Sequence, residues 1–287
     1  MVEPHGPALV ELEQPRLMEQ RRYFADDSPA DREEERLRAL EALCDGETTR
    51  RLDALGVGAG WRCLEVAAGH GSVARWLARR AGPSGRVVAT DLNPRFLRAA
   101  ELPANIEVRQ HDVLEHDFEP QAYDLVHARA LLVHMPDPER TVSRLAAAVR
   151  PGGWLLIEEA DFSMFRASDA HYPGADRFNR SVRRLLDAIG GAGIWDEALG
   201  HRTPLFVERL GFERTGYHCA PFMARGGDDP GGRFWSLTFP LSGPQLVAAG
   251  AVEQTDLDHV QACLADPEFR FIAGVLFGAW ARRAQSG

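Results

Sequence analysis

Residues 64–80 read LEVAAGHGSVARWLARR. A short apolar run leads into Ala-Ala-Gly-His-Gly, and the segment that follows carries apolar residues at helical spacing. Glycines at a strand-to-helix turn let the backbone approach a ligand, and the first amides of a helix favour negative or acceptor groups. A tight turn that needs glycine for its own geometry is the alternative interpretation. The stretch predicts a strand, a ligand-binding loop and a helix.

The same alternation continues along the middle of the chain. Short apolar runs follow segments with helical spacing, which is typical of βαβ units and a parallel sheet. The pattern predicts strands at 62–66, 86–90, 105–110, 123–128 and 151–160, and helices at 72–81, 94–100 and 138–150.

The two ends of the chain are less regular. Apolar residues recur at helical spacing over 31–55, and a Pro-rich segment with little expected regular structure precedes them. Past Asp161 we predict helices at 174–189, 196–210, 242–250 and 255–265, and a strand at 212–222. The final apolar segment, 269–283, is predicted as a strand because Gly274 and Gly278 weaken a helix.

Composition excludes several classes of function. The 287 residues carry a formal net charge of −9, whereas nucleic-acid binders usually show a basic footprint. The four cysteines are far apart and form neither a disulfide framework nor a zinc pattern, and His111-Asp112 and His116-Asp117 lack metal-ligand spacing. We find no signal peptide and no apolar run of membrane-spanning length. We therefore expect a cytoplasmic protein with no metal, nucleic-acid or membrane partner.

The glycine loop by itself allows two cofactors. Gly69-x-Gly71-x-x-Ala74 fits the dinucleotide fingerprint, and Asp91 follows Gly71 at the distance expected for an acid on the ribose hydroxyls of NAD. An NAD-dependent oxidoreductase therefore stays open. Against it, the chain has no Tyr-x-x-x-Lys pair for hydride transfer, and indeed no lysine.

A longer resemblance favours the second cofactor. The segment from Glu65 to Gly71 resembles the first motif of the class I S-adenosylmethionine-dependent methyltransferases, and the segments 87–97, 108–118 and 123–162 resemble its later motifs in order and spacing. The resemblance covers about residues 60–162. It implies an α/β Rossmann-like fold with a seven-stranded, mostly parallel sheet, helices on both faces and a helical cap. Residues 1–55 would form an N-terminal cap segment, and 56–287 the methyltransferase domain with cap insertions near 161–200 and 233–266.

The resemblance also implies a cofactor site at the carboxyl ends of the strands. Asp91 would bind the ribose hydroxyls, Asp112 the adenine amino group, and the glycine loop the amino-acid tail. The first glycine of the family motif is Ala67 here, which is tolerable if its backbone angles are ordinary for an L-residue. The expected cofactor-binding residues are Tyr23, Glu65, Ala67, Gly69, Gly71, Asp91, Leu92, Asp112, Val113 and Arg129.

Several of these residues have a structural alternative. Tyr23 either closes the pocket or tethers the N-terminal segment to the core. Arg129 either reaches the cofactor or acceptor, or pairs with an acid at the edge of the core. Glu158 either faces the site or is buried and paired.

Methyl transfer is an in-line displacement, so the enzyme mainly aligns the reactants and excludes water. A base is needed only where the acceptor loses a proton. His134, His171 and Tyr172 are the candidate catalytic residues. Packing of the loop is the alternative for His134, and a surface loop is the alternative for the other two.

The predicted function is methylation of a small acceptor by S-adenosylmethionine, by a monomer or homodimer. Aromatic residues after 161 favour an aromatic or lipophilic acceptor. The high Ala, Arg and Gly content suggests a GC-rich genome, such as that of a bacterium that makes secondary metabolites. Ala67 and the lack of an evident base also leave open a non-catalytic protein that retains the fold.

Overall fold

A mixed sheet forms the centre of the protein. The computed structural model describes residue 25 and residues 28–285, and its strand order is β3-β2-β1-β4-β5-β8-β6, with β7 pairing β8. The strands are β1 Arg62–Val66, β2 Arg86–Asp91, β3 Ile106–Gln110, β4 Tyr123–Arg129, β5 Val149–Asp161, β6 Arg166–Ala167, β7 Glu213–Arg225 and β8 Arg270–Arg282.

The first five strands run parallel and the last three are antiparallel to their neighbours. Parallel strands need crossover connections, and the helices between them supply these. The predicted architecture is confirmed. An eighth strand joins the expected seven because the two-residue β6 pairs with β8 beyond the end of β5.

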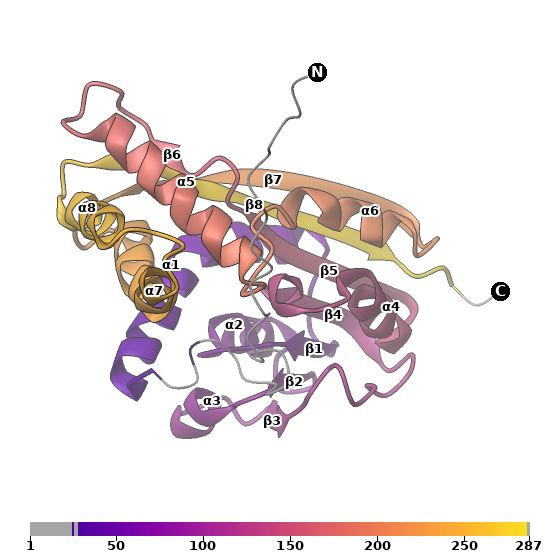
Figure 1. Ribbon diagram of the computed structural model, residues 1–287. Coiled ribbons are helices and arrows are strands. Elements are labelled where there is room, and N and C mark those ends of the chain that lie inside the picture. The colour runs from indigo at the N-terminus through magenta and orange to yellow at the C-terminus, as the bar shows by residue number, and fades with distance from the viewer. Residues whose placement is uncertain (1–24, 26–27, 286–287) are drawn as a thin grey trace, which may run out of the picture.

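Helices cover both faces of the sheet, as predicted. Helix α2 (Ser72–Ala81) packs on the parallel strands beside α1 (Ala30–Ala54), while α4 (Pro138–Ala148) and α6 (Thr203–Glu208) pack on β4, β5 and β8. Figure 1 shows α4 and α6 side by side, away from the α2 layer. The short α3 (Arg95–Ala99) follows β2. Two one-turn 3₁₀ helices complete the list: η2 (Leu132–His134) follows β4, and η3 (Gly200–Arg202) precedes α6.

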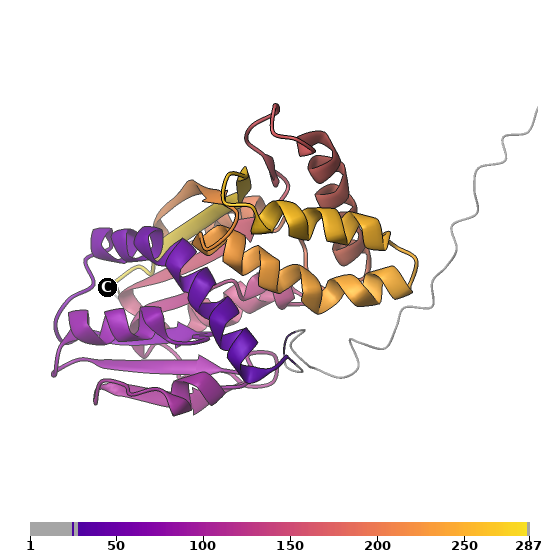
Figure 2. The ribbon, with the colours of Figure 1, turned by 90° about the vertical axis from the view of Figure 1, so that its left-hand side faces the viewer.

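A cap lies beyond the carboxyl ends of the parallel strands. It consists of α5 (Ala175–Gly191), α7 (Pro230–Ala248), α8 (Gln254–Ala265), the second half of β7 and the first half of β8, which pair with each other. Figure 2 shows α1 running from the sheet to this cap, where it packs on α7. Aromatic side chains fill the cap's core: Phe165, Phe178, Trp235, Phe239, Phe269 and Phe271.

The prediction of a strand rather than a helix at 269–283 is confirmed by β8.

Two predictions of helices are wrong in their bounds. Helix α7 begins at Pro230 rather than near 242, although it contains Pro240 and Pro244, because buried Trp235 and Phe239 anchor it in the cap core. The helix expected over 196–210 shrinks to η3 and α6, because Asp196 and Glu197 lie in a loop that lines a cavity.

Candidate functional site

Four strands end side by side at one edge of the sheet. Val66, the last residue of β1, is in register with Thr90 on β2 and Ala128 on β4. Asp91, the last residue of β2, is in register with Gln110 on β3. The segments that follow these strands therefore meet at this edge, where ligands bind in open parallel sheets.

The glycine loop turns sharply between β1 and α2. Ala67 has φ 57°, Gly69 φ 56° and Gly71 φ 91°, all in the left-handed region. The φ of 91° favours glycine at position 71, and a Cβ there would also lie 2.6 Å from Leu97 Cδ2, which would have to move. Ala67 therefore does not meet the condition of ordinary backbone angles under which alanine replaces the family's glycine without strain. A left-handed alanine costs roughly 1–2 kcal/mol, which the loop tolerates because surrounding contacts hold it.

The Asp91 carboxylate is fixed by the glycine loop. Its Oδ2 accepts a hydrogen bond from the Gly69 N–H at 2.9 Å, and its Oδ1 accepts from the Asn93 N–H at 2.9 Å. Leu92 follows and is 39% exposed. The acid and the loop predicted to hold one ligand are thus in direct contact.

The segment after β3 lies next to Asp91. Asp112 Oδ1 accepts a hydrogen bond from the Leu114 N–H at 2.8 Å, which orients the carboxylate, and Val113 between them is buried. The His111 N–H donates to the Asp91 carbonyl oxygen, which ties this segment to β2. The structure therefore brings together five of the predicted residues: Gly69, Asp91, Leu92, Asp112 and Val113.

Glu65 lies below the loop in a buried charge network. Its Oε2 is 2.6 Å from His127 Nδ1, and His127 Nε2 is 3.3 Å from Glu158 Oε2. Although burial opposes a charged imidazole, the two carboxylates outweigh it and raise the pKa of His127 to about 9. Glu158 is therefore buried and paired, and it also accepts a hydrogen bond from Thr48 Oγ1 at 2.5 Å.

Arg129, at the end of β4, contacts α1. Its Nη1 donates to Thr48 Oγ1 and its Nη2 to Asp45 Oδ1, each at 2.9 Å. Asp45 also accepts from Ser72 Oγ, at the start of α2. Of the two interpretations of Arg129, the structure places it in the salt bridge to an acid.

Helix α1 also holds the start of α2, which sequence reasoning did not predict. Glu41 Oε1 accepts a hydrogen bond from the Ser72 N–H at 2.9 Å, so a side chain from another helix satisfies this terminal amide. His70 lies between Glu34 and Glu41, with nitrogen–oxygen distances of 3.4 Å to each. Helical periodicity places such acids on α1 but does not indicate what they contact.

The segment after β4 is held by an acid that sequence reasoning missed. Glu159 Oε1 accepts hydrogen bonds from the Leu131 and Leu132 N–H groups, at 2.8 and 2.5 Å. Ala130, just before them, has φ 53°. Burial raises the pKa of Glu159 to about 8, although these amides oppose the shift. The two consecutive glutamates near the end of β5 were the available signal, since neighbouring strand residues point to opposite faces.

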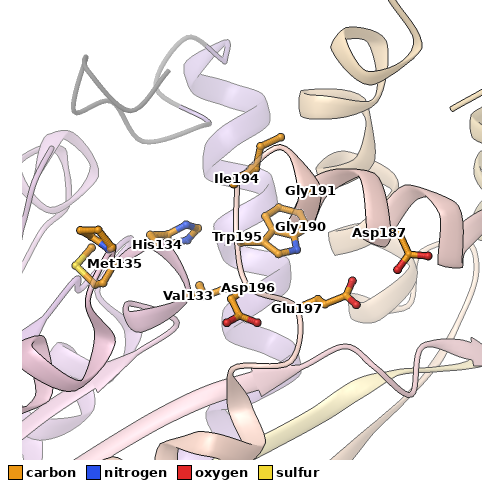
Figure 3. A pocket seen from close by; sticks show the side chains of 12 residues that line it. Val133, His134, Met135, Asp187, Gly190, Gly191, Ile194, Trp195, Asp196 and Glu197 are labelled. Carbon is orange, nitrogen blue, oxygen red and sulfur yellow. The ribbon is translucent and has the colours of Figure 1, made fainter. Parts of the chain in front are cut away.

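His134 ends η2 and lines a cavity of about 410 Å³. Burial, aided by the nearby Arg36 guanidinium, lowers the pKa of His134 to about 4, so its imidazole is neutral at pH 7. Figure 3 shows His134 across the cavity from the carboxylates of Asp187 and Glu197, with the ring of Trp195 between them.

His171 and Tyr172 lie at the far end of the cap. Tyr172 donates a hydrogen bond to Asp266 and packs on Phe269. The pairing of Val275 with Asp161 at the end of β5 puts Phe269 six residues farther along, a span of about 20 Å. His171 is exposed beside Tyr172. The structure does not bring either residue to the strand ends, and Tyr23 lies outside the described residues.

Within residues 25 and 28–285, no group of three or more His, Cys, Asp or Glu residues has the arrangement of a metal site. None of the helices described is long and apolar enough to cross a membrane.

Comparisons with known proteins converge on one fold and one domain type. Residues 63–153 match the model of a methyltransferase domain. The chain is 37% identical to Methyltransferase str3 of Strobilurus tenacellus over 135 residues, 47% of this chain and 48% of that protein. It is 35% identical to trans-aconitate 2-methyltransferase of Variovorax paradoxus over 141 residues, 45% of this chain and 53% of that protein. The chain thus spans about half the length of the curated relatives it matches.

Two solved structures share the fold. A putative methyltransferase from Bacillus halodurans superposes with a TM-score of 0.54 at 19% identity, covering 83% of this chain and 98% of that one. Phosphoethanolamine N-methyltransferase 2 of Haemonchus contortus, solved with S-adenosyl-L-methionine, has a TM-score of 0.52 at 18% identity and covers 84% of this chain and 53% of that one.

Proposed function

Because the chain belongs to the class I S-adenosylmethionine-dependent methyltransferases, we propose that it binds S-adenosylmethionine at the carboxyl ends of β1, β2 and β3 and methylates a small acceptor. The observation that carries the proposal is the direct contact between the glycine loop and Asp91, with Asp112 on the neighbouring segment.

The residues at this edge fit the chemistry of the cofactor. A carboxylate accepts hydrogen bonds only, which suits the ribose hydroxyls at Asp91 and the adenine amino group at Asp112. The left-handed glycines of the loop leave room for the amino-acid tail. Leu92 and Val113 would flank the nucleoside.

Glu65 and Arg129 receive a different part in this proposal. Because Glu65 contacts His127 and Arg129 contacts α1, we assign them to holding the ends of β1 and β4 and the overlying helix. Ala67 shapes the loop by its left-handed backbone. Contact of Tyr23 with the cofactor stays a prediction.

When bound, S-adenosylmethionine supplies a methyl group on a sulfonium. The chain's own residues would align the acceptor with that methyl group and exclude water. Of the three proposed catalytic residues, only His134 lies near the strand ends, and its imidazole is neutral at pH 7, which is the form in which a histidine acts as a base. His171 and Tyr172 are not part of the proposed chemistry.

We place the acceptor in the cavity beside η2. That helix follows the carboxyl end of β4, which neighbours β1, so the cavity lies at the same end of the sheet as the glycine loop. Met135, Ile194 and Trp195 line it and support an acceptor with an aromatic or lipophilic part. Of the two proposed cap insertions in the methyltransferase domain, the segment near 161–200 lines this cavity and the segment near 233–266 packs on its helix α5. We keep both a monomer and a homodimer in this proposal.

Calorimetric titration with S-adenosylhomocysteine, beside NAD⁺, tests the proposal. We expect S-adenosylhomocysteine alone to bind and Asp91→Ala to abolish its binding. Asp53→Ala, which removes an exposed acid of α1, is the matched control and should bind as the native protein does. Binding of NAD⁺ alone would overturn the proposal, and binding of neither would favour a protein that retains the fold without the activity.

A further inference from the structure

We infer that the cavity between η2 and the α5–α6 segment binds the cationic amino group of an aryl-alkyl amine. The inference rests on the proposed function, because it assigns a substrate class to the proposed acceptor pocket. Its basis is the charge balance of the cavity, one buried oxygen atom without a partner, and an aromatic wall.

The cavity has an excess of negative charge. Among the described residues, three carboxylates line it, those of Asp187, Asp196 and Glu197, and no arginine does. Arg183 bridges Asp187 and Glu197, and Arg202 pairs with Asp196. Within the part of the chain that the structure describes, two guanidinium groups therefore face three carboxylates, which leaves one negative charge.

Other cationic groups near the cavity do not reverse this balance. Arg36, whose charge acts on His134, forms an ion pair with Glu33 at 2.7 Å. His134 itself is neutral at pH 7, because burial lowers its pKa to about 4. A monocationic ligand would complete the charge balance, whereas a carboxylate ligand would add a second unpaired negative charge.

One carboxylate oxygen in the lining lacks a hydrogen-bond donor. Glu197 Oε2 is buried and has no partner among the described residues, while Glu197 Oε1 binds Arg183. The Glu197 carbonyl oxygen accepts from the Phe162 N–H at 2.7 Å, which fixes the backbone at this point. Because a buried carboxylate oxygen without a donor is costly, a cation placed beside Glu197 would stabilise this carboxylate through its charge.

The remaining wall is suited to an aromatic amine. Trp195 is only 7% exposed and lines the cavity together with Ile194 and Met135. Figure 3 shows the indole next to the Asp187 and Glu197 carboxylates. An indole attracts a nearby cation and also packs on an aryl ring, so one ligand can use both the carboxylates and the apolar wall.

Three ligands of similar shape, one cationic, one neutral and one anionic, test this inference. We would titrate the protein, with and without S-adenosylhomocysteine, with 2-phenylethylamine, 2-phenylethanol and phenylacetate. The amine should bind about tenfold or more tightly than the alcohol, and phenylacetate should bind most weakly. In Glu197→Gln the amine and the alcohol should bind equally. Asp187→Asn, at a carboxylate that is 64% exposed, should weaken the amine less.

Glu208→Gln is the matched control, since it removes an exposed carboxylate of α6 that does not line the cavity and should leave all three affinities unchanged. S-adenosylhomocysteine binding to each variant reports whether its fold and cofactor site are intact. The inference is overturned if the alcohol or phenylacetate binds as well as the amine, if none of the three binds, or if Glu197→Gln keeps the preference. If the native protein does not bind S-adenosylhomocysteine, this result would instead contradict the proposed cofactor.

Discussion

The Glu65 carboxylate lies 2.6 Å from the His127 imidazole inside the sheet, and both residues are almost completely buried. Glu158 contacts the other imidazole nitrogen, so a cationic histidine lies between two carboxylates on three neighbouring strands. Breaking a buried pair leaves an uncompensated charge. The network therefore makes the stability of the central sheet depend on each of its members.

Glu65→Gln should lower the free energy of unfolding by about 3–5 kcal/mol, because it removes one carboxylate from a buried imidazolium. Urea unfolding monitored by circular dichroism measures this change. Glu107→Gln is the control, since Glu107 pairs with Arg86 at the surface, and its effect should stay below about 1 kcal/mol. Equal effects of the two variants would contradict the burial argument.

Stability should fall as the pH rises from about 6.5 to 9. The pKa of His127 is about 9 in the folded protein and 6.5 in the unfolded chain, so its contribution is complete below pH 6.5 and is lost as the pH approaches 9. The difference corresponds to roughly 3 kcal/mol. Urea unfolding across this range, with NMR titration of the His127 ring protons, tests it, and a ring that titrates near 6.5 would refute it.

Glu159→Gln should reduce a second pH dependence of the protein's stability, that due to ionisation of Glu159. Because burial raises the pKa of Glu159 to about 8, ionisation of this carboxyl lowers stability as the pH rises from 4.5 to 8. Glutamine cannot ionise but retains an oxygen for the Leu131 and Leu132 amides. The variant should therefore keep these amides protected from hydrogen exchange while its stability changes less over this pH range.

Glu159→Leu separates the two properties of this residue. It removes the acceptor oxygen and should cost about 1–3 kcal/mol, because buried backbone amides lose their partner. Hydrogen exchange of peptides covering 130–135 should accelerate in Glu159→Leu but not in Glu159→Gln. Unchanged exchange in the leucine variant would show that Glu159 does not hold η2.

Ala67→Gly should stabilise the protein without ligand by about 1 kcal/mol, because glycine adopts φ 57° without the steric cost of a Cβ. Thermal unfolding measures the gain. Ala68→Gly provides the control at the next position, which is not among the positive-φ residues, and should destabilise by about 0.5–1 kcal/mol. A destabilised Ala67→Gly variant would show that the loop is unstrained.

Local sequence determined the order and type of most elements. Alternating apolar runs and helical spacing predicted the five parallel strands and their helices, since these periodicities reflect one buried face for each element. The motif at 65–71 and the position of Asp91 likewise indicated which end of the sheet would hold the proposed cofactor, because ligands bind in parallel sheets at the carboxyl ends of the strands.

Tertiary structure decided what each polar side chain contacts. Helix α7 forms across Pro240 and Pro244 because its aromatic residues are buried against distant strands, which local propensity cannot anticipate. Glu158 and Glu159 are neighbours in sequence, yet one contacts the buried His127 and the other holds η2, because strand residues alternate between the two faces. Arg129 contacts α1, and Tyr172 lies far from the strand ends, because partners distant in the chain set the position of each side chain.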